Sequence, residues 1–182
     1  MTIGNNKWLI INNKTKKSNA KNINTKIEHL RNWINDTFYT GKIREFCNSK
    51  EMVCQGASRL LYRRLLNPIN QTVLREIIGA DVETLNIIGG VGHNYLTIKL
   101  GDKLIIIDPT FGQFVRSHNK IFVGTVENIK QIFASSPISI SASIDIYEHT
   151  RGKLKPTIDN NFMNHVKKSL ATGERHYNNN NY

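Results

Sequence analysis

Hydrophobic and polar positions alternate with a helical period through the first part of this chain. Beyond Asn24, large apolar side chains return about once per helical turn, which places them on one face and predicts a first helix over residues 25–39. The apolar members of this face are Ile27, Leu30, Trp33, Ile34 and Phe38. Glycine is a poor helix former, so Gly41 is expected to lie beyond the end of this helix.

Two further helical series follow the first. One begins at or just after Cys54 and is expected to end at Asn67, because Pro68 disfavours helical backbone in the residue before it. The other covers residues 69–78, and Gly79 is expected to end it. The polar segment that precedes Cys54 is expected to form a turn.

After Gly79 the pattern changes from helical to strand-like. Residues 82–88, 94–100 and 103–108 are short runs rich in β-branched side chains, and turn-forming glycines separate them. The separators are Gly89-Gly90 and Gly101-Asp102. We therefore expect these runs to form neighbouring antiparallel strands.

The C-terminal part predicts three more elements. Thr125 is expected to cap a short helix that ends near Phe133, and alternating isoleucines over residues 138–146 indicate a half-buried strand. Residues 159–170 have the spacing of a last helix. Helices that precede a run of strands are typical of an α+β fold.

The chain length of 182 residues fits one compact domain. Residues 12–24 are basic, polar and nearly free of large apolar side chains, so we expect residues 1–24 to form a mobile basic arm. Residues 25–172 are then a single domain, and residues 173–182 form a polar, asparagine-rich tail.

Lysine and arginine number 25 against 14 aspartates and glutamates, and the resulting net charge of +11 favours anionic partners. No apolar run is long enough for a membrane span, and the N-terminus lacks the pattern of a secretory signal, so we expect a soluble protein. Two cysteines and scattered histidines provide neither a disulfide framework nor a metal site, and we expect no cofactor and no metal.

Cys54 is the first candidate for chemistry. At a helix N-terminus, unpaired backbone N–H groups and the helix dipole stabilise a thiolate, which makes this cysteine a plausible nucleophile. The alternative is a buried structural cysteine, a role that free cysteines often have. Cys47 lies in the polar turn, and only the structural role is expected for it.

His93 and Asp108 are expected to meet on one face of the sheet. If the chain reverses at Gly101-Asp102, His93 lies opposite Thr110 and Tyr95 lies opposite Asp108, so the histidine and the aspartate are diagonal neighbours about 7–8 Å apart at the backbone. The alternative for Asp108 is a solvated strand end. Taken with Cys54, these residues supply the nucleophile, base and orienting carboxylate of thioester-mediated acyl transfer.

With these residues in the order Cys, His, Asp, the sequence resembles the papain-like superfamily, including its transglutaminase-like members. The resemblance lies in Cys54-Gln55-Gly56-Ala57, Gly92-His93-Asn94-Tyr95 and Ile107-Asp108-Pro109-Thr110, and it covers about residues 48–114. It implies a papain-like fold, in which the nucleophile at a helix start packs on an antiparallel sheet. The spacing is most similar to small bacterial toxin and effector domains, some of which deamidate a glutamine in a host protein.

The same resemblance implies a role for Asn48. Papain-like proteases place a glutamine about six positions before the cysteine to donate to the oxyanion, and Asn48 occupies that position. Asparagine carries the same amide on a shorter side chain. The alternative is that Asn48 only forms the turn before the helix.

We therefore expect a cysteine hydrolase that deamidates a glutamine side chain of a target protein with an acidic docking face. It would be made in the bacterial cytoplasm and delivered to a host or target cell without a Sec signal. Proteolysis and transglutamination use the same triad and remain alternatives. From other classes, a basic nucleic-acid-binding domain and an inactive interaction domain are alternatives, but no nucleic-acid motif supports the former.

Overall fold

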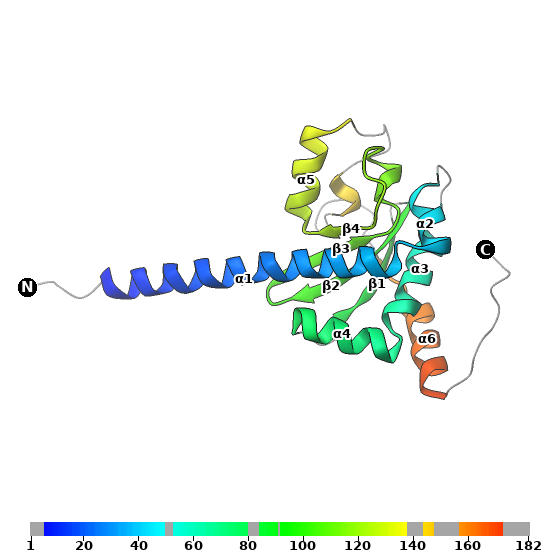
Figure 1. The fold of residues 1–182 in the computed structure, drawn as a ribbon, viewed down its shortest axis with the longest axis horizontal. Helices are drawn as coiled ribbons and strands as arrows, with labels where there is room; N and C mark the ends of the chain where they lie inside the picture. Colours follow the sequence, from blue (N-terminus) through cyan, green and yellow to red (C-terminus); the bar gives the residue numbers. More distant parts are fainter. Residues whose placement is uncertain are drawn as a thin grey trace, which may run out of the picture.

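The computed structural model describes residues 6–49, 53–79, 84–90, 92–137, 144–147 and 157–172, with side chains from residue 22 onward. It has an α+β fold, in which helices cover an antiparallel sheet of five strands in the order β4-β3-β2-β1-β5 (Figure 1). The helices are α1 (Asn6–Phe38), α2 (Gly41–Cys47), α3 (Cys54–Leu65), α4 (Pro68–Ile78), α5 (Val126–Ser135) and α6 (Asn160–Thr172). The strands are β1 (Asn86–Gly90), β2 (His93–Leu100), β3 (Lys103–Asp108), β4 (Phe122–Gly124) and β5 (Thr157–Ile158).

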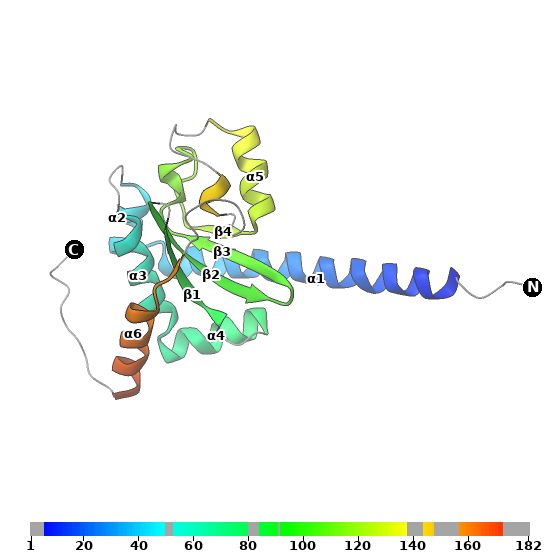
Figure 2. The same ribbon diagram turned by 180° about the vertical axis from the view of Figure 1, so that it is seen from behind.

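Each face of the sheet has its own hydrophobic cluster. On one face, strand residues such as Ile87, Leu96 and Ile107 pack with side chains of α1, α3, α4 and α6. On the other face, Ile88 and Ile106 pack with Ile129 of α5 and with side chains in and beside two 3₁₀ turns, η2 (Phe111–Gln113) and η3 (Ile144–Ile146). The alternation of side chains along each strand produces this division. Figures 1 and 2 show the two sides of the sheet, with α1 crossing one of them.

The first helix begins well before the predicted start. The sequence predicts it over residues 25–39, but α1 runs from Asn6, so most of the predicted arm has helical backbone. No glycine or proline interrupts the chain between Gly4 and Gly41, and each residue added to an existing helix gains a hydrogen bond. The N-terminal part of α1 extends beyond the rest of the molecule (Figure 1).

The predicted boundaries of α3, α4, β2, β3, α5 and α6 are confirmed to within about a residue or two. Thr125 accepts a hydrogen bond from the Asn128 N–H and completes a capping box, and Gly79 ends α4 with a φ of +60°. In the described part of the chain, the predicted strand over residues 138–146 is wrong, because residues 144–146 form η3 and the remainder lies outside the described residues.

The Gly89-Gly90 pair lies within β1 and not in the predicted turn. Gly90 pairs with His93, which leaves only two residues for the turn, and Gly92 adopts a φ of +77°. A Cβ at Gly89 would lie 2.8 Å from the Asn94 amide nitrogen, so glycine makes room for the Asn94 side chain. The short elements α2, β4 and β5 were not predicted, because they contain too few residues for a period to be visible.

The predicted tail, residues 173–182, lies outside the described residues. No helix among the described residues is long and apolar enough to cross a membrane. The structure establishes the α+β class, and the papain-like topology stays a prediction.

Candidate active site

Cys54 is the first residue of α3 and is buried, with 6% of its surface exposed. The first hydrogen bond of the helix runs from the Ala57 N–H to the Val53 carbonyl at 2.9 Å, so the backbone N–H groups of residues 54–56 have no carbonyl partner within the helix. The Ser58 hydroxyl donates to the Asn94 carbonyl at 2.9 Å, which fixes α3 against β2 next to His93. The sulfur therefore lies at the positive end of the helix, as the sequence predicted.

His93 and Asp108 meet as the hairpin predicted. Leu96 pairs with Ile107 and Leu100 pairs with Lys103, which is the register expected for a turn at residues 101–102. His93 Nε2 lies 2.7 Å from Asp108 Oδ2, and both side chains are buried. The spatial prediction is confirmed, and the solvated alternative for Asp108 is wrong because that residue is 0% exposed.

The Asp108 carboxylate has four hydrogen-bond contacts. Oδ1 accepts from the backbone N–H of Thr110 at 2.8 Å and from its hydroxyl at 3.1 Å. Oδ2 contacts His93 and accepts from the Tyr147 hydroxyl at 2.6 Å. Because an ionised carboxylate offers about four lone-pair sites and no donors, this set satisfies it fully and explains how the charge is tolerated in the core.

Asp108 and His93 shift one another's pKa in opposite directions. Burial alone would raise the pKa of Asp108, but the charge and hydrogen bond of His93, with donation from Tyr147 and Thr110, hold it below its usual 3.8. Burial alone would lower the pKa of His93, but the Asp108 charge and hydrogen bond, followed by the contact with Cys54, raise it to about 9. His93 is therefore an imidazolium at neutral pH.

Cys54 is hydrogen-bonded to His93. His93 Nε2 is directed at Asp108, which leaves Nδ1 as the ring nitrogen for this bond. Burial alone would raise the pKa of the Cys54 thiol, but this hydrogen bond and the His93 charge outweigh it and bring the pKa below 9.0. The chain Cys54, His93, Asp108 thus favours a thiolate–imidazolium pair.

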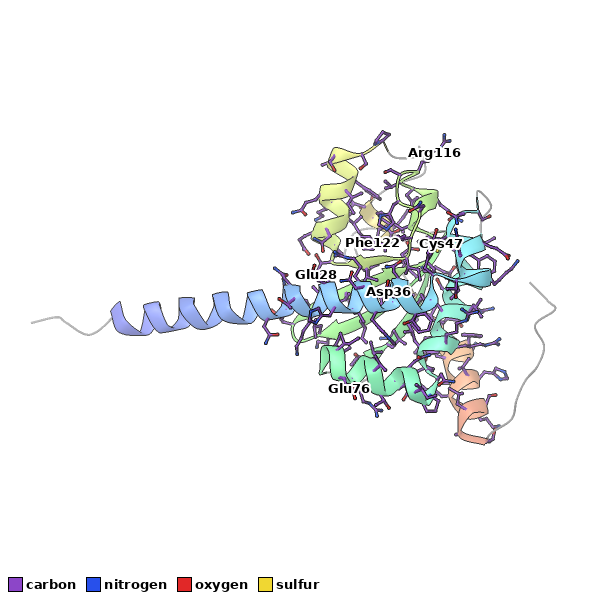
Figure 3. The ribbon with its side chains drawn as sticks, in the orientation of Figure 1. Glu28, Asp36, Cys47, Glu76, Arg116 and Phe122 are labelled. Carbon is purple, nitrogen blue, oxygen red and sulfur yellow. The ribbon has the colours of Figure 1, made fainter. Side chains whose placement is uncertain are left out.

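Cys47 has the opposite character. Cys47, which is labelled in Figure 3, is the last residue of α2 and is buried. Burial and, to a lesser extent, the Asp108 charge raise the pKa of its thiol to about 12. A thiol with this pKa is not ionised at neutral pH and is a poor nucleophile. The structural role predicted for Cys47 fits this environment.

Asn48 is exposed and follows α2 as its C-cap. Its amide nitrogen donates to the Arg44 carbonyl at 2.9 Å and lies 3.3 Å from the Tyr39 hydroxyl. Donation to an oxyanion would require these bonds to be given up. Of the two predicted roles, the geometry favours a residue that ends the helix and forms the turn.

Sequence reasoning missed Tyr147. This residue is fully buried and reaches Asp108 from a segment 39 positions away in the chain. The alternating isoleucines before it indicated a strand, and a strand prediction carries no information about which buried carboxylate a neighbouring tyrosine meets. No local signal identifies such a partner.

An open, polar groove of about 560 Å³ is lined by α3, β1, β2, β5 and the start of α6. Its lining includes Gln55 and Asn94, the residues that follow Cys54 and His93 in the chain. Two further carboxamides, Asn160 and Asn161, contribute from α6. The charges of Arg59 and Asp159 in this lining are paired, with 2.9 Å between nitrogen and oxygen. A surface of this kind both donates and accepts hydrogen bonds without a strong charge.

Among the residues that the structure describes, no group of three histidine, cysteine or acidic side chains could hold a metal ion. No protein-family model, curated protein or solved structure matches the chain. The interpretation of the site therefore depends on its own geometry.

Proposed function

We propose that this protein is a thiol-dependent acyl-transfer enzyme that deamidates a glutamine side chain of a target protein. The observation that supports this most directly is His93 held between a buried carboxylate at 2.7 Å and the Cys54 sulfur at a helix N-terminus. A nucleophile, a base and an orienting group in this order are what acyl transfer needs. The papain-like resemblance of the sequence supports the same class.

In the proposed reaction, the Cys54 thiolate attacks the carboxamide carbon of the substrate. The negative charge on the tetrahedral oxygen is stabilised by the backbone N–H groups at the start of α3. The His93 imidazolium gives its proton to the departing nitrogen, so that ammonia leaves and an acyl thioester remains. Neutral His93 then takes a proton from water, and the resulting hydroxide attacks the thioester. Collapse of the tetrahedral intermediate releases the Cys54 thiolate, and His93 keeps the proton that it took from water, so the thiolate–imidazolium pair is restored. The new carboxylic acid loses its proton to the released ammonia, which leaves a glutamate side chain.

The groove lined by Gln55 and Asn94, the residues that follow Cys54 and His93 in the chain, suits a polypeptide substrate. Its carboxamides can pair with both the N–H and the C=O of a peptide backbone, which single-sign charges cannot do. The net charge of +11 suits docking on an acidic face of a folded protein, because charge complementarity speeds association. Action inside a host or target cell, after delivery from a bacterial cytoplasm, is part of the same proposal.

Thiol alkylation tests the enzyme class without knowledge of the target. At neutral pH, iodoacetamide should label Cys54 far faster than Cys47, and labelling should be read by peptide mass spectrometry. His93→Ala should slow the labelling of Cys54 toward that of an ordinary thiol. Equal, slow labelling of both cysteines in the wild-type protein would exclude an activated nucleophile.

Mass spectrometry of acidic candidate targets in heavy-oxygen water tests the reaction itself. The expected product is a glutamate that contains one heavy oxygen, formed by the wild-type protein and not by Cys54→Ala, while Cys47→Ala retains the activity. A new chain end that contains heavy oxygen would instead indicate proteolysis, and coupling to an added amine would indicate transglutamination.

A further inference from the structure

Two hydrogen-bond partners meet at the same oxygen of Asp108. Oδ2 lies 2.7 Å from His93 Nε2 and 2.6 Å from the Tyr147 hydroxyl. Tyr147 is completely buried, and burial raises the pKa of its phenol well above 10, so it remains protonated and acts as the donor. The tyrosine thus touches the orienting carboxylate rather than the sulfur.

The position of Tyr147 is fixed from two directions. Its backbone N–H donates to the Ile144 carbonyl at 2.9 Å, and the carbonyl of the preceding Ile146 accepts from the Tyr95 hydroxyl at 3.1 Å. The Tyr147 ring also packs edge-on against His93, with 5.9 Å between centroids. One tyrosine therefore holds the η3 turn, and the tyrosine that follows the turn holds Asp108.

We propose that Tyr147 is a positioning residue of the Cys54, His93, Asp108 site. This inference rests on the proposed function. With Thr110 donating twice to Oδ1, the Tyr147 hydroxyl completes the set of four and prevents rotation of the carboxylate. The Tyr147 hydroxyl also withdraws part of the negative charge of Oδ2. It thereby limits how far Asp108 raises the pKa of His93.

Removal of this hydroxyl should act on His93 in a defined direction. With one donor lost, more of the Oδ2 charge acts on His93, so the imidazolium should be lost at a higher pH. The carboxylate also gains freedom to rotate, and misplacement of a catalytic group can lower turnover by up to about 10²-fold. A merely structural tyrosine would lower stability without moving the titration of His93.

Among the described residues, the titratable groups coupled to Asp108 have pKa shifts of different direction. They are His93 and Tyr95 on β2, Cys54 on α3, Cys47 on α2, His118 after η2, and Tyr147. Burial raises the pKa of Cys47 and of both tyrosines, whereas burial lowers the pKa of His118 below 6.5. The pKa of Cys54 is lowered below 9.0, so the more alkaline step of the Cys54–His93 pair, near pH 9, is the one in which His93 loses its proton.

The experiment measures the rate of Cys54 alkylation by iodoacetamide against pH in Tyr147→Phe, with Tyr62→Phe as the control. Both changes remove one fully buried tyrosine hydroxyl, but Tyr147 touches Asp108, whereas Tyr62 packs in the cluster on the other face of the sheet and its hydroxyl has no hydrogen-bond partner among the described residues. The alkaline step near pH 9 should move upward in Tyr147→Phe and stay in place in Tyr62→Phe. Where a substrate is known, turnover should fall further in Tyr147→Phe.

The two possible failures are distinguishable. A folded Tyr147→Phe with the wild-type pH profile would overturn the positioning role while Cys54 remains activated. An ordinary thiol profile for Cys54 in the wild-type protein would instead overturn the proposed function. If Tyr147→Phe does not fold, NMR of the wild-type protein provides the test. The chemical shift of the buried Tyr147 hydroxyl proton should change as His93 titrates. A chemical shift that does not change with pH would contradict the inference.

Discussion

Every group that contacts the Asp108 carboxylate is a hydrogen-bond donor or can act as one, and this determines what an amide would do there. In Asp108→Asn, the amide nitrogen would face His93, because the backbone N–H of Thr110 requires an oxygen on the other side. His93 would then accept at Nε2 and carry its proton on Nδ1, toward Cys54. A neutral imidazole in this tautomer cannot take the thiol proton, so the thiolate–imidazolium pair does not form.

We therefore predict that Asp108→Asn folds and loses turnover on the order of 10⁴-fold while residual activity remains. Nitrogen NMR of the His93 imidazole should show the exchanged tautomer, and steady-state assays on an identified target should give the rate. Wild-type turnover in the folded variant would exclude Asp108 as the orienting residue.

Asn48 allows a second test at the scale of one residue. Because its amide is bound to the Arg44 carbonyl and lies near the Tyr39 hydroxyl, Asn48→Ala should weaken the end of α2. The expected result is a lower unfolding midpoint, by no more than roughly a few degrees, with turnover of the folded fraction unchanged. A loss of about 10²–10³-fold in turnover at unchanged stability would instead establish Asn48 as an oxyanion donor.

At the scale of the element, α1 has a packed part and a projecting part. Its described core contacts begin at Ile23, which is partly buried, and continue through the buried residues Ile27 and Leu30. Side chains of the same region bind backbone of other elements: Lys26 donates to the Ile78 carbonyl and Arg31 to the Val123 carbonyl. The packed part of α1 therefore belongs to the domain that contains the site.

Deletion of residues 1–21 should leave the unfolding midpoint and the alkylation rate of Cys54 unchanged, because the described core contacts lie beyond the deletion. Differential scanning calorimetry and the iodoacetamide assay would measure both. Deletion of residues 1–30 is the control, since it also removes Ile27 and Leu30 and should destabilise the fold by several kcal/mol. Unfolding of the shorter deletion would show that the predicted arm is part of the domain.

At the scale of the whole molecule, the site makes two opposite contributions to the pH dependence of stability. The pKa of His93 rises from 6.5 to about 9 on folding, so its contribution is full below pH 6.5 and is lost as the pH rises through about 9. The pKa of Cys54 is lowered from 9.0, so its contribution is present above pH 9.0 and is lost as the pH falls through the folded value. At pH values below about 9, the stability contributed by His93 therefore falls as the pH rises, while the stability contributed by Cys54 increases.

Cys54→Ala removes one of the two slopes. Between pH 6.5 and about 9, its unfolding midpoint should fall more steeply with rising pH than that of the wild-type protein, because only the His93 contribution remains. Thermal unfolding of both proteins across this range would measure the difference. Identical slopes would mean that Cys54 and His93 do not form an ion pair.

The sequence by itself determined the parts of this protein that depend on local rules. The end of α3 before Pro68, the end of α4 at Gly79 and the cap at Thr125 follow from the conformational preferences of single residues. The diagonal approach of His93 to Asp108 also follows, because a two-residue turn fixes the register of every pair in a hairpin. Local rules alone therefore bring two of the three proposed catalytic residues together.

Only the tertiary structure decided which distant segments meet. It brought Cys54 to His93 and Tyr147 to Asp108, and it formed β4 and β5 from segments too short to show a period. A hydrophobic pattern states which side of an element is buried and leaves open what it is buried against. These contacts depend on how the layers pack around the sheet. The partners of each buried hydrogen bond come from segments that are distant in the sequence, so local rules cannot predict which groups will meet.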